Sequence, residues 1–96
     1  MKYSVALKVT RINNVFNKDT KEFMYECIDK NGKVYSFKSE ARISIHNYIA
    51  CEFNKYTIVD GAIRPINFSI YPLNVKDNKL YLYNTLYVSK NYPKIN

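Results

Sequence analysis

Apolar and polar residues alternate along most of this 96-residue chain, and no segment carries a helical stripe over three turns. The first alternating run covers residues 3 to 16, with Val5, Leu7 and Val9 on one face. The phase then slips, so that Ile12 is the next apolar position. A slip inside a long strand indicates a β-bulge or a bend. The pattern therefore predicts an all-β protein that begins with a long, bent strand.

A hairpin around residues 30 to 33 (KNGK) can be placed in register from its side chains. A two-residue Asn-Gly turn mixes the two faces. A three-residue loop with the glycine in the left-handed region pairs Cys27 with Tyr35 and Tyr25 with Phe37. Aromatic pairs on one face stabilise a sheet, so we expect the second register.

The middle of the chain continues the strand pattern after one ambiguous segment. Residues 39 to 47 (SEARISIHN) fit either a short helix or an irregular connection. Alternation resumes over residues 48 to 53, and Asp60-Gly61 then predicts a second hairpin. Pro65 and Pro72 place the return strand of that hairpin near a sheet edge, because proline cannot donate to a strand ladder.

The last predicted strand covers residues 80 to 89 and has one aliphatic and one tyrosine face. The tyrosine face carries Tyr81, Tyr83 and Tyr87. Because the aliphatic face can pack on the core, we expect these three tyrosines to face solvent or a partner. Residues 90 to 96 are expected to fray.

Composition indicates one domain over residues 1 to 96 and an excess of positive charge. The chain has 15 Lys and Arg against 8 Asp and Glu, a formal net charge of +7. Such a charge favours an anionic partner, above all a nucleic acid. The plain alternative is a lysine-rich surface that serves solubility. AT-rich coding also raises the lysine and tyrosine content together, which weakens the argument from charge.

Enzyme and metal chemistry lack the residues they need. His46 is the only histidine, and Cys27 and Cys51 alternate with apolar neighbours, which is typical of buried structural thiols. Gly32 and Gly61 are the only glycines, so a glycine-rich phosphate loop is excluded. Carboxylates are scattered, and neither a signal peptide nor a transmembrane run is recognisable. We expect a non-enzymatic, cytoplasmic protein without metal, cofactor or membrane association.

The order of these elements resembles the OB-fold. The resemblance lies in the bent strand through residues 8 to 12, the hairpin at 30 to 33, the connector at 39 to 47 and the strand at 48 to 53. It spans roughly residues 3 to 71 and is architectural, without a diagnostic motif. It implies a small OB-like barrel of five to six strands, to which the C-terminal tyrosine strand is an extra. A small β-sandwich and an SH3-like barrel are the alternatives.

Small single-stranded-DNA-binding proteins of phages and mobile elements are similar in size, charge and layout. The resemblance implies a DNA-binding module that acts in DNA replication or recombination and binds across strands 2 and 3 and the flanking loops. RNA fits as well, since recognition of the 2′-hydroxyl leaves no signature in composition. Residues 90 to 96 lack the acidic tip with which the bacterial single-strand-binding family recruits partners.

Two other classes of function stay open. The chain could be an accessory subunit that docks on a DNA polymerase, primase or helicase through the tyrosine strand, or pairs there with a second copy as a homo-oligomer. It could also be a phage-type inhibitor of a host enzyme, which its size and charge allow.

Binding of a single strand needs cations for the phosphates and flat rings for the bases. The aromatic face of the first hairpin fits either a binding platform or the core, and both interpretations stay open. The candidate nucleic-acid-binding residues are Lys8, Arg11, Lys21, Lys33, Tyr35, Phe37, Lys38, Arg42, Arg64, Tyr81, Tyr83 and Tyr87.

Overall fold

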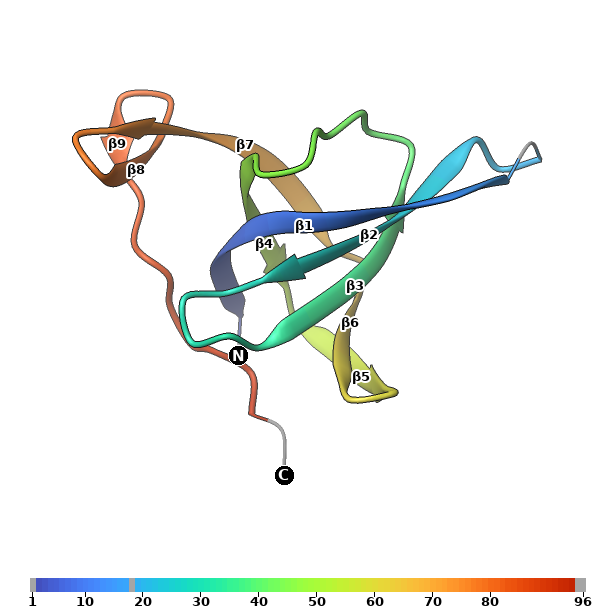
Figure 1. Ribbon diagram of the computed structural model, residues 1–96. Coiled ribbons are helices and arrows are strands. Elements are labelled where there is room, and N and C mark those ends of the chain that lie inside the picture. The colour runs from blue at the N-terminus through green and yellow to red at the C-terminus, as the bar shows by residue number, and fades with distance from the viewer. Residues whose placement is uncertain (1, 18, 95–96) are drawn as a thin grey trace.

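The computed structural model describes residues 2–17 and 19–94, and the side chains of all of these except residues 14–17. Over this range the protein is all-β, as predicted, and holds no helix that could cross a membrane (Figure 1). The strands are β1 (Tyr3–Asn17), β2 (Glu22–Ile28), β3 (Val34–Ser39), β4 (Tyr48–Phe53), β5 (Lys55–Val59), β6 (Ala62–Ile66), β7 (Ser69–Lys76), β8 (Lys79–Leu82) and β9 (Thr85–Leu86).

The nine strands pair in the order β5-β6-β3-β2-β1-β4-β7-β8-β9. All pairs are antiparallel except β3 with β6, which meet in parallel at Tyr35 and Ile63. The order has two ends, β5 and β9, so strand pairing does not close the sheet. The prediction is therefore confirmed as an all-β protein but not as an OB-like barrel of five to six strands.

Strand β1 is long and bent, as the slip in its pattern predicts. Its first half pairs with β4 and its second half pairs with β2, and the register to β2 shifts between Val9 and Arg11. The Thr10 hydroxyl donates to the Glu26 carbonyl at 3.1 Å beside this bulge. The bulge lets one strand serve two neighbours, which curves the sheet around a single core.

The β2–β3 hairpin has the predicted register, with Cys27 opposite Tyr35 and Tyr25 opposite Phe37. Gly32 sits at φ 82° in its loop, where a side chain would be strained. Asp29 holds the same loop, because its Oδ1 accepts the N–H groups of Asn31 at 2.8 Å and Lys33 at 3.0 Å.

The core lies under β1, β2, β3, β4 and β6, and the aromatic face of the first hairpin forms much of it. Tyr35 is 0% exposed and Phe37 is 2% exposed, so the interpretation of this face as core is the one that the burial supports. The buried residues that cluster in this core are Val5, Leu7, Val9, Tyr25, Cys27, Tyr35, Phe37, Ile49, Cys51, Phe53 and Ile63.

The connector between β3 and β4 is irregular rather than helical. The buried Tyr25 ring reaches it with its hydroxyl, which donates to the Ala41 carbonyl at 2.5 Å and accepts the Ile43 N–H at 3.2 Å. The end of the connector is also held to β1, because the His46 N–H donates to the Val9 carbonyl at 2.7 Å and the Val9 N–H donates to the Asn47 carbonyl at 2.9 Å.

The second predicted hairpin is confirmed at Asp60-Gly61, where φ is 52° and 79° and Val59 faces Ala62. Its return strand is broken into β6 and β7, with Asn67 at φ 52° in the break. Strand β4 likewise leads into β5 across a single residue, Asn54. Because of these two breaks, the predicted hairpin becomes two short strand pairs, β5 with β6 and β4 with β7.

The C-terminal region differs most from its prediction. A single strand over residues 80 to 89 is wrong: β8 ends at Leu82, the chain turns at Tyr83-Asn84, and β9 follows. A further hairpin at Asp77-Asn78, with φ 52° and 62°, joins β7 to β8. Period-2 alternation assigns residues to faces, but it does not show where a chain reverses. Because the chain turns at Tyr83-Asn84, the straight tyrosine ladder does not exist.

Residues 90 to 94 are docked rather than frayed, while residues 95 and 96 lie outside the described residues. Lys90 forms an antiparallel bridge with Ser4, with backbone hydrogen bonds of 3.0 and 2.6 Å. Pro93 is buried, and its carbonyl accepts a bond of 2.8 Å from Lys33 Nζ. Figure 1 traces this segment from β9 back past the N-terminus.

Candidate functional site

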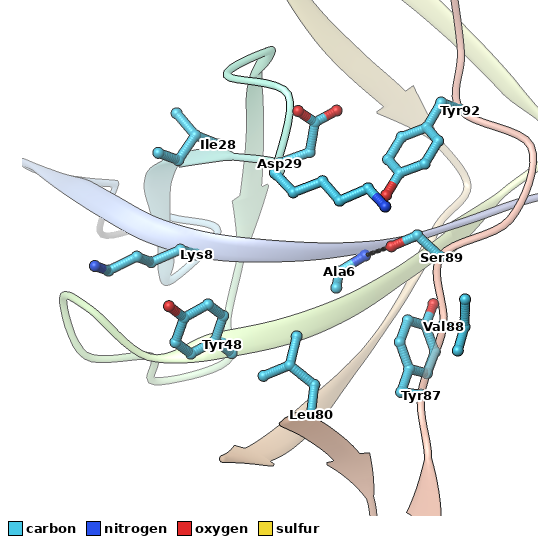
Figure 2. A pocket seen from close by; sticks show the side chains of 11 residues that line it. Ala6, Lys8, Ile28, Asp29, Tyr48, Leu80, Tyr87, Val88, Ser89 and Tyr92 are labelled. Atoms are coloured by element: carbon cyan, nitrogen blue, oxygen red, sulfur yellow. Dashed lines mark hydrogen bonds between the residues drawn. The ribbon is translucent and has the colours of Figure 1, made fainter. Parts of the chain in front are cut away.

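An open groove of about 450 Å³ lies between the outer face of β1 and the C-terminal segment (Figure 2). Ala6 and Lys8 of β1 alternate with buried neighbours and so point outward. Tyr48 of β4 is the cross-strand partner of Lys8 and shares its face. The floor of the groove is therefore formed by outward-pointing side chains of the paired strands β1 and β4.

The wall of the groove comes from far along the chain. Residues 87 to 89 and Tyr92 line one side, and Leu80 of β8 and the start of the β2–β3 loop complete the rim. The Ala6 N–H donates to Ser89 Oγ at 2.8 Å, which fastens the wall to the floor. The volume lies within the range of small ligand sites, about 300–1,000 Å³.

Three tyrosines and two lysines meet around this groove. Lys8 Nζ lies 6.0 Å from the centre of the Tyr48 ring, and Lys30 Nζ lies 5.8 Å from that of Tyr92. Both distances are within the cation–π range of about 6 Å. The Tyr87 hydroxyl shares a short hydrogen bond with Ser4, and burial raises the pKa of this tyrosine.

Asp29 is the acidic residue on the rim, and it is 4% exposed. Its carboxylate accepts the two loop N–H groups described above and, through Oδ2, the Tyr35 hydroxyl at 3.2 Å. These donors keep the Asp29 carboxylate turned toward the loop and the core. The charge in the open part of the groove is therefore that of the cations Lys8 and Lys30.

Among the described residues, no group of three or more His, Cys, Asp or Glu side chains could hold a metal ion. Burial raises the pKa of Cys27 and of Cys51 to about 12, so both remain protonated thiols at neutral pH. The groove offers rings, ammonium groups and aliphatic surface, which suit binding.

Of the twelve candidate residues, the groove brings together Lys8 and Tyr87, and Lys33 lies beside it through its bond to Pro93. Tyr35 and Phe37 must be withdrawn as a binding platform, because both rings are buried in the core. This register places both rings on the same face as Tyr25 and Cys27, and that face covers the core.

The remaining candidates do not converge on one groove. Arg42 stacks on the Phe23 ring at 4.5 Å beside a depression of about 200 Å³. Arg64 lies in the hollow between the outer face of β2 and β3 and the Asp60-Gly61 turn. Tyr81 and Tyr83 lie together in a further hollow at the β8–β9 turn. The three that are simply exposed on other parts of the surface are Arg11, Lys21 and Lys38.

The outer face of β2 and β3, where the OB-fold resemblance places the ligand, carries no aromatic ring in its hollow. Its lining includes Met24, Glu26, Val34 and Ser36. A single strand would find neither a stacking surface nor a purely cationic path there. The described chemistry favours the β1 groove over that face.

Sequence reasoning missed Tyr48, Tyr92 and Lys30. Alternation with the buried Ile49 already points Tyr48 outward, so this residue could have been found. Tyr92 follows no regular pattern, and Lys30 lies in a turn. Only the docking of the C-terminal segment brings these two into the groove.

No protein-family model, no curated protein and no solved structure matches this chain. Its function must therefore be argued from the residues of the groove.

Proposed function

We propose that this protein is a non-enzymatic module that binds single-stranded nucleic acid in the β1 groove. DNA undergoing replication or recombination, in a phage or mobile element, is the expected ligand. The observation that carries the proposal is the meeting of Tyr48, Tyr87 and Tyr92 with Lys8 and Lys30 around one open groove.

The two lysines give this groove a way to admit a base. Each ammonium lies near the ring of its own tyrosine, where the attraction is about 0.5–1 kcal/mol at an exposed site. A phosphate attracts the ammonium more strongly, because the charges are opposite. When a backbone phosphate draws Lys8 away, the Tyr48 ring is left for a base, and stacking contributes about 1–3 kcal/mol.

An OB-like arrangement is part of this proposal. Three features support it: β1 is shared between β2 and β4, β3 meets β6 in parallel, and β4–β5 with β6–β7 form one long, bent hairpin. Because β5 follows β4 after one residue, the chain itself connects the β5 end of the pairing order to β4, which pairs with β1. The chain would then wrap around its core as an OB-fold does, with its ligand on a different face.

Fluorescence anisotropy with labelled single- and double-stranded oligonucleotides over a salt series tests the proposal. Binding that favours single strands and weakens with salt is the expected result. Each phosphate neutralised on a single strand should contribute about −0.7 to the slope of log affinity against log salt. Absence of binding at low salt would refute the proposal.

Matched variants place the ligand. Tyr48→Ala should weaken binding about 5- to 100-fold through the loss of one stacking surface. Tyr71→Ala is its control, since Tyr71 is also half-buried but lies outside the lining of the groove. Lys8→Ala should lower the salt slope by about 0.7, whereas Lys55→Ala, on exposed β5, should leave it unchanged.

A protein partner is the second candidate, and exposed apolar side chains favour it. Val75, Leu86 and Val88 are 56%, 49% and 62% exposed, all of them on or after β7. An accessory subunit that docks on a DNA polymerase, primase or helicase would cover such residues. Copurification with one of these enzymes, together with failure to bind oligonucleotides, would favour this alternative.

A further inference from the structure

The hairpins at the end of the sheet form a projecting flap, defined here as residues 74 to 86 (Figure 1). Within it, Asn74 faces Tyr81, and Lys76 faces Lys79. Cross-strand partners lie on the same side of a sheet, as do residues two apart in one strand. One face of the flap therefore carries two lysines, an asparagine and a tyrosine.

Tyr83 stands at the tip of the flap. Its side chain is 77% exposed, and its φ of 57° is a left-handed conformation that costs an L-residue about 1–2 kcal/mol. Neither burial nor backbone preference accounts for a large ring at this position. Strain of this kind is often found where a side chain has a function.

A hollow of about 410 Å³ joins the tip to the flap face. It is lined by Asn74, Lys76, Tyr81, Tyr83 and Asn84. The two rings can stack on bases, the ammonium can pair with a phosphate, and the two amides can bond base edges. Asp77 is the sole acid among residues 74 to 86, against two lysines.

We propose that this flap face is a second nucleic-acid contact, which binds a stretch of single strand beyond the stretch held in the β1 groove. The proposal rests on the proposed function of that groove. Leu80 lines the groove from the other side of the flap, because it alternates with Tyr81. A strand that leaves the groove must therefore pass around the flap edge to reach Tyr83.

This path makes the contribution of the flap depend on ligand length. An oligothymidylate of about 5 nucleotides can occupy the groove alone, whereas one of about 20 nucleotides exceeds the roughly 4–16 that one OB-fold covers. Only the longer ligand should reach both sites.

Two substitutions at the tip isolate the ring. Tyr83→Asn removes the ring, and asparagine tolerates the left-handed conformation, so the turn is preserved. Tyr83→Phe keeps the ring and removes the hydroxyl. The asparagine variant should bind the longer oligothymidylate about 5- to 100-fold more weakly and the shorter one with unchanged affinity. The phenylalanine variant should match the original protein at both lengths.

The same titrations separate failure of the two proposals. If the original protein binds neither oligothymidylate, the groove proposal fails. If the longer one binds and Tyr48→Ala weakens it, but Tyr83→Asn does not, the flap proposal alone is overturned. Equal weakening of both lengths by Tyr83→Asn also overturns it, because the flap would then belong to the first contact. Loss of binding at both lengths by Tyr83→Phe would overturn it as well, because the hydroxyl rather than the ring would then act, and in the first contact.

Discussion

The β2–β3 hairpin and the flap are both built from antiparallel strands and both carry tyrosines, yet only the hairpin buries them. Strands β2 and β3 lie between β1 and β6, so their aromatic face closes over the core. Strands β8 and β9 are the last two at one end of the pairing order. Alternation decides which residues share a face, and the neighbours of a strand decide whether that face is covered.

The packing of the two regions differs accordingly. In the hairpin, the Phe37 ring lies 5.8 Å from that of Tyr25 and 5.1 Å from that of Phe68. The hydroxyls of Tyr25 and Tyr35 both have partners inside the protein. In the flap, Tyr83 projects into solvent. The same residue type therefore stabilises the fold in one hairpin and is available to a ligand in the other.

The largest effect on stability is expected from removing an aromatic ring in the β2–β3 hairpin. Phe37→Ala should lower the free energy of unfolding by about 3–5 kcal/mol, because it leaves a cavity among packed aromatic rings. Urea denaturation followed by circular dichroism measures this loss. Phe37→Leu, which keeps more of the volume, should cost less and guards against a variant too unstable to measure. A loss below about 1 kcal/mol for Phe37→Ala would contradict the core assignment.

A smaller loss is expected from the carboxylate that holds the hairpin loop. Asp29→Ala removes the acceptor of two loop N–H groups and of the buried Tyr35 hydroxyl. The loop amides can turn to water, while the hydroxyl is left without its partner. We expect a loss of about 2–3 kcal/mol in urea denaturation. Asp29→Asn is the control, since it keeps an oxygen acceptor and should lose less.

The core also gives the protein a pH dependence on the alkaline side. Burial raises the pKa of Cys27 and Cys51 from 9.0 to about 12, with smaller contributions from neighbouring acidic groups. Between pH 9 and 12 the unfolded chain releases these protons while the folded chain retains them. The contribution of both thiols to the free energy of unfolding is therefore fully present below pH 9. It falls as pH rises, by up to about 1.4 kcal/mol per pH unit for each thiol.

Urea denaturation from pH 8 to 10.5 measures this slope. The double variant Cys27→Ala with Cys51→Ala should begin from a lower stability and lose less with each pH unit. The comparison of slopes isolates the thiols, because the tyrosines are present in both proteins. Identical slopes would contradict the burial of the two thiols.

The smallest effect is expected at the flap tip. Tyr83→Gly should change the free energy of unfolding by less than about 1 kcal/mol, and in the stabilising direction, since glycine adopts the left-handed conformation without strain. A thermal or urea melt is sufficient to measure it. A loss of 2 kcal/mol or more, on the order of a core truncation, would mean that the ring packs on the fold, and the contrast between the two hairpins would disappear.

Much of the first 60 residues follows from local rules in the sequence. The slip after Val9 predicted the bulge, and the aromatic pairs predicted the register of Tyr25 with Phe37. The turn at Asp60-Gly61 was also found. In each case the residues that interact lie close in sequence, or one turn type fits them best.

The C-terminal region could not be predicted in the same way. Asp77-Asn78 is a two-residue turn signal that could have been recognised, since both residues tolerate left-handed φ. Tyr83 gave no such signal, because a tyrosine is rarely found in that conformation. The docking of Tyr92 and Pro93 depends on contacts with residues far away in the chain. The candidate site was therefore found only in part, through Lys8 and Tyr87.

The bond between Ser4 and Tyr87 joins residues separated by 83 positions. During synthesis, β1 emerges long before the residues that complete its edge and the wall of the groove. Closing so long a loop costs conformational entropy, which is offset only when the C-terminal segment makes its contacts with β1. A nascent or truncated chain can therefore form the β2–β3 hairpin early and still lack the groove. Under the proposed function, binding of a single strand would require the wall residues 87 to 92, so a chain that lacks them should not bind nucleic acid.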